Sequence, residues 1–216
     1  MDEAVREGQA VYSRRVLSIY DWWVLGISNR WIWRCPSPHL LGHYNQQLSA
    51  NHLDIGVGTG YFLDKCTFSA GQPRIVLMDL NPNTLAYASQ RIARYQPQTV
   101  QHNVFEPFPE MPSFDSVGLN FLLHCLPGPM AHKLTLLDNL KPVLNPGARL
   151  FGSTILQGEV PRSWAARRLM AIYNRKGIFH NQSDTLTDLD TGLKTRFQNV
   201  TIKIRGCVAI FSAQAP

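Results

Sequence analysis

Several features that define special classes of protein are absent from this sequence of 216 residues. It has no run of about 18 apolar residues, as a membrane-spanning helix requires, and it begins on acidic residues where a secretory signal would be basic. The four cysteines include no Cys-x-x-Cys pair, so neither a zinc site nor a disulfide framework is indicated. We therefore expect a cytoplasmic protein with reduced thiols and no metal ion.

The chain also lacks a strong charge bias over most of its length. Residues 1–50 carry five basic and four acidic groups, and residues 51–155 carry seven of each. The net charge of +6 comes almost entirely from residues 156–216, with nine basic and four acidic groups. This excess can attract an anionic partner, or it can be an ordinary solvated face. The length and a hydrophobic content of 44% fit one packed domain.

Short apolar runs alternate with amphipathic stretches from residue 52 onward, a pattern typical of βα units and a parallel sheet. The predicted strands are 52–55, 74–78, 99–103, 116–120 and 148–155. Helices are predicted over 82–95 and 130–140, the first capped by Asn81 with Pro82 at its first position. A turn is predicted at 145–147, where the chain reads Asn-Pro-Gly.

The pattern changes after residue 155. Helices are predicted over 161–174 and over 183–197, the latter with Ser183 as its cap. Two strands, 200–204 and 208–212, then follow with a turn near Gly206. We interpret this close of the chain as an antiparallel hairpin, which a dinucleotide dehydrogenase does not normally show.

The most informative motif is Leu-Asp-Ile-Gly-Val-Gly-Thr-Gly at residues 53–60, followed by Asp79 at the end of the next strand. Glycines there turn the chain sharply and let its backbone approach a ligand closely. The acid can accept hydrogen bonds from ribose hydroxyls. A dinucleotide fingerprint needs a third glycine where this chain has Tyr61, so a pyrophosphate cradle is the weaker interpretation.

These elements, with the Phe-Asp-Ser-Val entry at 114–117 and the Leu-Asn-Pro-Gly-Ala turn at 144–148, resemble class I S-adenosylmethionine-dependent methyltransferases. The resemblance covers about residues 50–212. It implies a Rossmann-like three-layer α/β sandwich with a seven-stranded, mostly parallel sheet in the order 3-2-1-4-5-7-6. The seventh strand would be antiparallel. Residues 51–216 would form this core, and residues 1–50 a helical lid belonging to the same domain.

The resemblance also implies the contacts with S-adenosylmethionine, whose product is S-adenosylhomocysteine. Asp54 would order the glycine loop, Asp79 would bind the ribose, and Leu80 would lie against adenine. Asn103 stands where many family members have an acid, and it can still accept from the adenine amino group. The full predicted set is Asp54, Gly56, Val57, Gly58, Gly60, Asp79, Leu80, Asn103, Val104 and Asn120. Asn120 can equally be a strand-end turn residue.

Aromatic side chains crowd the first 50 residues, with four of the five tryptophans between positions 22 and 33. An aromatic lid would exclude water and shape an apolar pocket for the methyl acceptor. The predicted acceptor-binding residues are Tyr12, Tyr20, Trp23, Trp33 and His124. The same rings can instead simply pack the lid onto the sheet. Peripheral membrane contact is the less favoured alternative, because the segment has a small polar face.

His124, four residues beyond Asn120, is the predicted general base, a group needed only if the acceptor keeps its proton at neutral pH. A lone histidine is more often a structural residue, and that alternative stays open. His102, Tyr12 and Tyr20 are weaker candidates.

The sequence thus predicts an enzyme that methylates O, N, S or activated C of a small, apolar or aromatic metabolite, as a monomer or homodimer. Two alternatives remain. One is a methyltransferase acting on RNA or another anionic substrate, although no amine-methylating motif or contiguous basic run is present. The other is a module that binds S-adenosylmethionine without catalysis.

Overall fold

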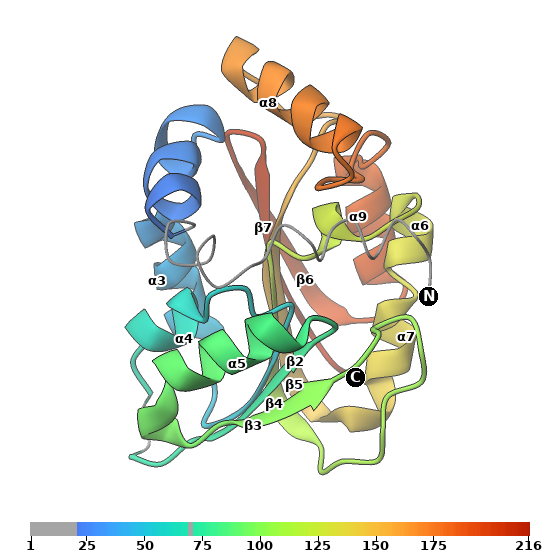
Figure 1. Ribbon diagram of the computed structural model, residues 1–216. Coiled ribbons are helices and arrows are strands. Elements are labelled where there is room, and N and C mark those ends of the chain that lie inside the picture. The colour runs from blue at the N-terminus through green and yellow to red at the C-terminus, as the bar shows by residue number, and fades with distance from the viewer. Residues whose placement is uncertain (1–20, 69–70) are drawn as a thin grey trace.

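The computed structural model describes residues 21–68 and 71–216 (Figure 1). Within this part of the chain, seven strands form one sheet in the order β3-β2-β1-β4-β5-β7-β6. They are β1 (Asn51–Ile55), β2 (Arg74–Asp79), β3 (Gln98–Gln101), β4 (Phe114–Asn120), β5 (Leu144–Ile155), β6 (Gln198–Arg205) and β7 (Val208–Gln214). β7 runs antiparallel to both of its neighbours, and the pairs from β3 to β5 are parallel. The predicted sheet order and antiparallel last strand are confirmed.

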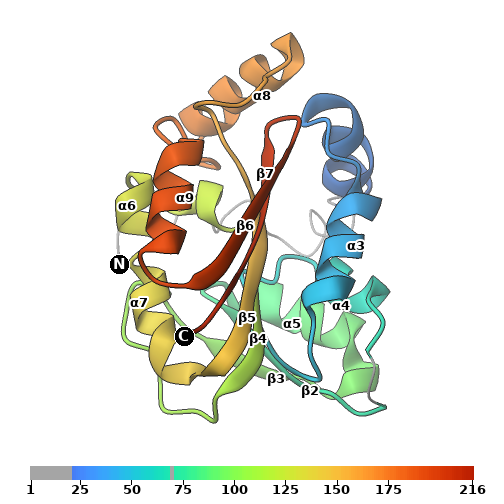
Figure 2. The same cartoon turned by 180° about the vertical axis from the view of Figure 1, so that it is seen from behind.

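Helices cover both faces of the sheet (Figures 1 and 2). α3 (Ser37–Gln47), α4 (Tyr61–Lys65) and α5 (Pro82–Arg91) lie on one face, and α6 (Met130–Lys133), α7 (Leu136–Leu140) and α9 (Leu186–Lys194) lie on the other. α8 (Trp164–Arg175) stands beyond the carboxyl ends of the parallel strands. Shorter helical segments are η1 (Asp21–Ile32, a π-helix), η2 (Ala93–Tyr95), η3 (Leu123–Cys125) and η4 (Lys141–Val143).

The central strands are buried because both of their faces are covered by helices. In β1, β2 and β4 nearly every residue is buried, and Leu53, Leu77 and Val117 are fully enclosed. Such strands read as near-continuous apolar runs, as parallel sheets require. β6, at one edge of the sheet, alternates exposed and half-buried residues instead, because its outer face meets solvent. This difference explains why the central strands were the easiest to predict.

Several element boundaries differ from the sequence prediction. β3 ends at Gln101, so Asn103 lies in the loop after the strand rather than within it. The helix predicted over 82–95 is divided into α5 and η2, and the helix predicted over 130–140 into α6 and α7. Pro129 precedes α6, and the chain turns between the two short helices at Leu134. The prediction of continuous helices was therefore wrong in both places.

Two turn and cap predictions also need correction. The Asn-Pro-Gly turn at 145–147 is a bulge inside β5: Phe114 pairs with Leu144, but Ser116 already pairs with Arg149. Gly147 has φ +74°, a conformation that glycine accepts without strain. The cap of α9 is Thr185, whose side chain accepts the Asp188 N–H, and not Ser183. The Asn81 cap of α5 is confirmed, since its side chain accepts the Asn83 N–H.

The described part of the predicted lid divides in two. α3 packs directly on the sheet: the His43 Nε2 lies 2.9 Å from the Phe211 carbonyl oxygen, and the Arg149 guanidinium donates to the Gln46 carbonyl. η1 lies at the end of the molecule beside the tip of the β6–β7 hairpin (Figure 1). There the Cys207 N–H donates to the Trp33 carbonyl, and a Cβ on Gly206 would collide with that oxygen. Among the described helices, none is long and apolar enough to cross a membrane.

Candidate functional site

The glycine loop joins β1 to α4 and bends back over the carboxyl end of the sheet. Gly56, Gly58 and Gly60 all have positive φ values, +71°, +52° and +71°, which side chains with a Cβ rarely adopt. The Gly56 N–H donates to the Met78 carbonyl, and the Gly60 N–H donates to the Val57 carbonyl. Val57 itself is buried. The loop is thus fixed to β2 by hydrogen bonds and by three conformations that favour glycine.

The three glycines face different surroundings. A Cβ on Gly56 would lie 2.8 Å from Leu122 Cδ1, and a Cβ on Gly60 would lie 3.2 Å from the α5 backbone at Ala88. A Cβ on Gly58 would meet nothing within 4 Å. Gly56 and Gly60 are therefore needed for packing as well as for backbone geometry. Gly58 leaves open space over the loop, as close approach of a ligand to backbone requires.

Asp79 ends β2 next to this loop. Its Oδ1 accepts the Asn81 N–H at 2.9 Å. Burial raises the pKa of the carboxyl group to about 6, against the opposing effect of hydrogen bonds from the backbone amides of Asn81, Val57 and Leu80. Asp54 raises this pKa further through like charge. Asp79 is consequently ionised at neutral pH and half-buried, and it can accept two hydroxyl groups at once.

Asp54 is almost fully enclosed, with 6% of its surface exposed. The Tyr44 hydroxyl donates to its Oδ2 at 2.5 Å, and the His52 Nε2 lies 3.7 Å from the same oxygen. Sequence reasoning missed Tyr44 and His52. A signal was present, because His52 and Asp54 alternate on one side of a strand expected to be apolar on both faces.

The loop after β3 holds Asn103 and Val104 near the sheet edge. The Asn103 Oδ1 accepts the Phe105 N–H at 3.2 Å, and its Nδ2 donates to Glu106 at 3.1 Å. Val104 is buried in the core. The side-chain amide of Asn103 is therefore used within its own loop, which limits what it can offer a ligand. Leu80 is half-buried, and its carbonyl oxygen accepts the Gln101 side-chain amide.

Asn120, the last residue of β4, has one unused polar group. Its Oδ1 accepts the Ser153 hydroxyl at 3.2 Å, whereas its buried Nδ2 has no hydrogen-bond partner among the described residues. The next residue, Phe121, has φ +55°, which is uncommon for a bulky side chain. Unsatisfied donors and strained backbone concentrate at binding sites. Both features make the carboxyl end of β4 a candidate part of the site.

His124 lies in η3, where 3% of its surface is exposed. Its Nδ1 lies 3.3 Å from the Ile155 backbone nitrogen and 3.4 Å from the Thr154 hydroxyl. Burial, with a smaller effect of Lys133, lowers the pKa of the imidazole to about 3. The Ile155 N–H donates to Nδ1, so the ring proton is on Nε2. The neutral ring holds η3 against β5, and this geometry favours the structural alternative over the base.

Aromatic rings surround His124 and form what we term the aromatic cluster: Trp33, Phe121, His124, Tyr173 and Phe179. The ring centroids of His124 and Phe179 are 4.5 Å apart, and Phe179 lies 6.0 Å from Trp33. The ring centroid of Phe121 lies 5.7 Å from that of His124, and the ring centroid of Tyr173 lies 5.0 Å from that of Phe179. Trp33 is 2% exposed. Two of the five predicted acceptor-binding residues thus come together in one apolar cluster.

The other three predicted acceptor residues are not placed by this structure. Tyr12 and Tyr20 lie outside the described residues, and Trp23 lies in η1 without a described side chain. His102, a weaker candidate base, is found in the loop after β3, where its ring packs edge-on against Phe108 and its Nε2 lies 3.3 Å from the Glu106 carbonyl oxygen. It is separate from the aromatic cluster.

A buried ion pair, Lys133–Asp184, lies near the aromatic cluster and binds the segment that leads to it. The Lys133 Nζ donates to Asp184 at 2.6 Å and to the His180 carbonyl at 2.9 Å, and both charged side chains are fully enclosed. The His180 N–H donates to the His124 carbonyl. The pair therefore ties α6 to the segment between α8 and α9, and the His180 N–H joins that segment to η3. Sequence reasoning missed it because the partners are 51 residues apart and each looks like a surface charge.

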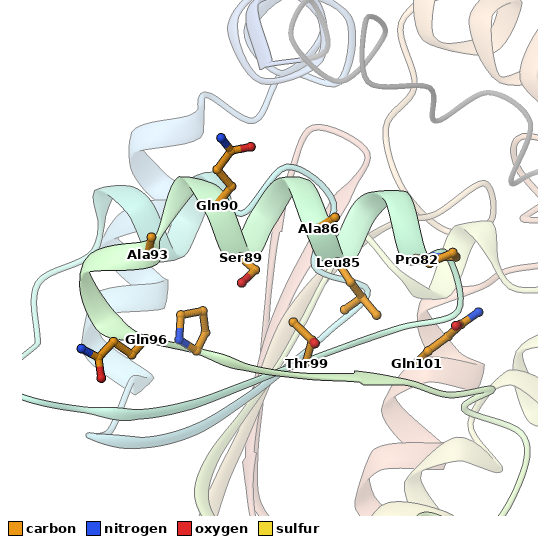
Figure 3. Close-up of a pocket in the computed structure, with 10 residues that line it drawn as sticks. Pro82, Leu85, Ala86, Ser89, Gln90, Ala93, Gln96, Thr99 and Gln101 are labelled. Atoms are coloured by element: carbon orange, nitrogen blue, oxygen red, sulfur yellow. The ribbon is translucent and has the colours of Figure 1, made fainter.

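A groove of about 640 Å³ lies elsewhere, between α5 and the edge strand β3 (Figure 3). It is lined by Pro82, Leu85, Ala86, Ser89, Gln90, Ala93, Gln96, Pro97, Thr99 and Gln101. These side chains include no titratable group and none of the predicted cofactor residues. The groove has no acid or base to contribute to catalysis. Among the residues that the structure describes, no group of three or more His, Cys, Asp or Glu side chains is placed to hold a metal ion.

The sheet order, the glycine loop and an acid at the end of β2 define a Rossmann-like nucleoside-binding enzyme fold. Comparison with known proteins gives the family. A family model described as a methyltransferase domain matches residues 53–150. Demethylluteothin O-methyltransferase of Streptomyces thioluteus is 43% identical over 99% of this chain and 93% of its own length. The chain belongs to the class I S-adenosylmethionine-dependent methyltransferases, as the motifs predicted.

Two further proteins illustrate this membership. A physcion biosynthesis cluster O-methyltransferase of Aspergillus chevalieri is 38% identical over 97% of this chain and 95% of its own length. The solved structure of the N-methyltransferase NodS from Bradyrhizobium japonicum WM9, in complex with S-adenosyl-L-homocysteine, superposes with a TM-score of 0.65 at 19% identity and covers all of both chains. That likeness concerns the fold. The relatives favour a small-molecule methyltransferase over the RNA-modifying and non-catalytic alternatives.

Proposed function

We propose that this enzyme transfers the methyl group of S-adenosylmethionine to a hydroxyl oxygen of a small, apolar, aromatic molecule. The observation that carries the proposal is the 43% identity, over nearly the whole chain, to a protein named as an O-methyltransferase. The physcion-cluster relative is also named for transfer to oxygen. Oxygen is therefore favoured over the N, S and C atoms that the motifs alone left open.

The residues around the glycine loop fit the cofactor. Gly58 has open space above it, and Asp79 is ionised and able to accept both ribose hydroxyls. The unpartnered Nδ2 of Asn120 is a donor suited to the carboxylate of the methionine moiety, and Asp54 is an acceptor for its amino group. Leu80 and the backbone of Val104 remain our proposed adenine contacts, with Asn103 contributing less. When bound, the cofactor supplies an electrophilic methyl group on a sulfonium.

The aromatic cluster fits an apolar acceptor. Its rings stand beyond the carboxyl ends of β4 and β5, and one of them, the strained Phe121, directly follows Asn120. Apolar walls exclude water and orient the acceptor, and these effects can provide most of the acceleration in a methyl transfer. We propose that the part of residues 1–50 that precedes α3, with Tyr12, Tyr20 and Trp23, closes this end as a lid. Trp33, packed against Phe179, would form one wall of the acceptor pocket.

The proton of the acceptor must leave if the acceptor is a phenol, whose ordinary pKa is about 10. His124 is poorly suited to take it, because the pKa of the ring is about 3 and its Nδ1 is already an acceptor. We propose that His124 orients η3 and the aromatic cluster. The test is His124→Gln. If this variant loses turnover and its turnover no longer falls on the acidic side of the pH profile, His124 is the general base after all.

The reacting atom can be tested with matched acceptors. The purified enzyme would be incubated with S-adenosylmethionine and with naphthols, naphthylamines and naphthalenethiols that share one ring skeleton. We expect methylation of the hydroxyl compounds alone, recognised by product mass and by the proton resonance of an O-methyl group. Methylation of the amine or thiol in preference to the hydroxyl would overturn the proposal. So would the absence of product from a wider panel of phenols when S-adenosylhomocysteine binds normally.

A further inference from the structure

A chain of buried and half-buried polar groups begins at Asp54, just before the glycine loop, and we term it the polar relay: Asp54, Tyr44, His52, Ser116 and Ser49. The Tyr44 Oη lies 2.5 Å from Asp54 Oδ2 and 3.0 Å from His52 Nε2. The His52 Nδ1 lies 2.8 Å from the Ser116 hydroxyl, which is 2.8 Å from that of Ser49. Tyr44, His52 and Ser116 are fully enclosed.

The directions of these hydrogen bonds follow from counting protons. Burial, together with the charge and hydrogen bond of Asp54, raises the pKa of Tyr44 well above its usual value, so the phenol keeps its single proton. That proton goes to Asp54, the strongest acceptor within reach. The Tyr44 oxygen then accepts a proton from His52 Nε2, which must carry an N–H.

The far end of the relay adapts to the charge of His52. If the ring is neutral, Ser49 donates to Ser116, and Ser116 donates to His52 Nδ1. If the ring carries a second proton, Nδ1 donates to Ser116, Ser116 donates to Ser49, and Ser49 donates to the Asn51 carbonyl 2.9 Å away. Reversing two hydroxyl groups therefore satisfies both states. Tyr44 donates to Asp54 in either case.

We propose that Tyr44 is a positioning residue for the methyl donor, holding Asp54 as an oriented carboxylate whatever the protonation state of His52. The relay commits one oxygen of Asp54 and leaves the other for the glycine loop or the cofactor amino group. This inference rests on the proposed cofactor contact of Asp54. It adds a function for α3, which the sequence assigned only to a lid.

A purely structural role for Tyr44 is the competing explanation, because its ring also packs in the core. It stacks on Phe62 with centroids 5.5 Å apart and meets Phe151 edge-on at 5.1 Å. Tyr44→Phe keeps both ring contacts and removes only the hydroxyl. The variant should therefore fold, as a thermal melt and a circular dichroism spectrum would show. Tyr95→Phe, which removes a hydroxyl from a ring packed on Phe68, is a matched control.

The test is a double-mutant cycle on affinity for S-adenosylhomocysteine, measured by calorimetric titration. The variants are Tyr44→Phe, Asp54→Asn and the two combined. We expect Tyr44→Phe to weaken binding by about tenfold in the wild-type background, as loss of a hydrogen bond to a charged group does. In the Asp54→Asn background the same change should alter binding less than twofold. Tyr95→Phe should have no effect.

The possible failures are distinguishable. An equal weakening by Tyr44→Phe in both backgrounds would show a structural role and overturn the proposal, as would no weakening in either. If Asp54→Asn alone leaves affinity unchanged, the proposed cofactor contact of Asp54 fails and the relay proposal falls with it. Should Tyr44→Phe not fold, His52→Gln takes its place in the cycle, with about threefold weakening expected and the same coupling to Asp54 required.

Discussion

The two ends of the site are built in different ways. At the cofactor end, the glycine loop, Asp79 and Asp54 come from β1, β2 and the turns that follow them, within the 26 residues from Asp54 to Asp79. The residues of the acceptor end are spread over 147 residues of the chain, from Trp33 through Phe121 and Tyr173 to Phe179. The first arrangement is local and depends on backbone geometry. The second depends on long-range packing.

Stability is also distributed differently between them. At the acceptor end the buried polar groups have their partners, as in the Lys133–Asp184 pair and the hydrogen-bonded His124. At the cofactor end, two groups oppose folding in the absence of a ligand. They are the carboxylate of Asp79, whose pKa is raised by burial, and the unpartnered Nδ2 of Asn120. Function and stability often conflict in this way at binding sites. Substitutions in the two ends should therefore have opposite effects on stability.

The largest expected effect is at the acceptor end, on breaking the buried ion pair. Lys133→Met leaves Asp184 charged and enclosed, which should lower the free energy of unfolding by about 3 to 5 kcal/mol in urea titrations. Lys133→Met combined with Asp184→Leu should recover most of that loss, because no buried charge remains. Lys194→Met, which breaks an exposed pair with Asp190, is the control and should cost less than about 1 kcal/mol. A single-variant loss as small as the control's would show that water reaches the pair.

In contrast to Lys133→Met, Asp79→Asn should stabilise the protein without ligand, and it should weaken binding at the cofactor site. The folded pKa of about 6 exceeds the unfolded value of about 3.9, so the ionised carboxylate opposes folding by about 2 to 3 kcal/mol above pH 6. That cost vanishes below pH 4, where both states are protonated. We expect Asp79→Asn to bind S-adenosylhomocysteine at least tenfold more weakly. Its melting temperature should exceed that of the wild type at pH 7.5, and this difference should shrink at pH 4. Unchanged affinity in a folded variant would remove Asp79 from the site.

The third prediction is that buried His124 lowers the stability of the folded protein at acidic pH. Its folded pKa of about 3 lies below the unfolded value of about 6.5, so its contribution to stability is complete above pH 6.5 and falls as the pH drops toward 3. By pH 5 the loss is about 2 kcal/mol. The wild type should therefore lose that much more stability than His124→Gln between pH 7 and pH 5, as urea unfolding at each pH would measure. Parallel pH profiles for the two proteins would mean that solvent reaches the ring.

The same contrast explains what the sequence could predict. The central strands, the three glycines and Asp79 follow from short-range patterns, because strand burial and positive φ leave a local mark in the choice of residue. The sheet order was implied by the family resemblance that these patterns carry. Tyr44 and the Lys133–Asp184 pair leave none, since each becomes meaningful only when a distant segment packs against it, and His52 leaves only its alternation with Asp54 in β1. The Thr185 cap was missed by two residues for a related reason. Ser183 is an equally good capping residue, and tertiary contacts of the adjoining Asp184 decide where α9 begins.

The smallest expected effect concerns the polar group that has no partner. Asn120→Ala removes the buried Nδ2, and loss of one hydrogen bond to a carboxylate costs about 1.5 kcal/mol, so affinity for S-adenosylhomocysteine should fall about tenfold. Removing an unsatisfied donor should at the same time leave the free energy of unfolding of the unliganded protein unchanged or higher. Ser153→Ala deletes the hydroxyl that donates to the Asn120 Oδ1 and keeps the Nδ2, so its affinity should change less than twofold. If instead Asn120→Ala destabilises the protein and binds as the wild type does, Asn120 belongs with the structural groups of the acceptor end, and the distinction between the two ends fails at β4.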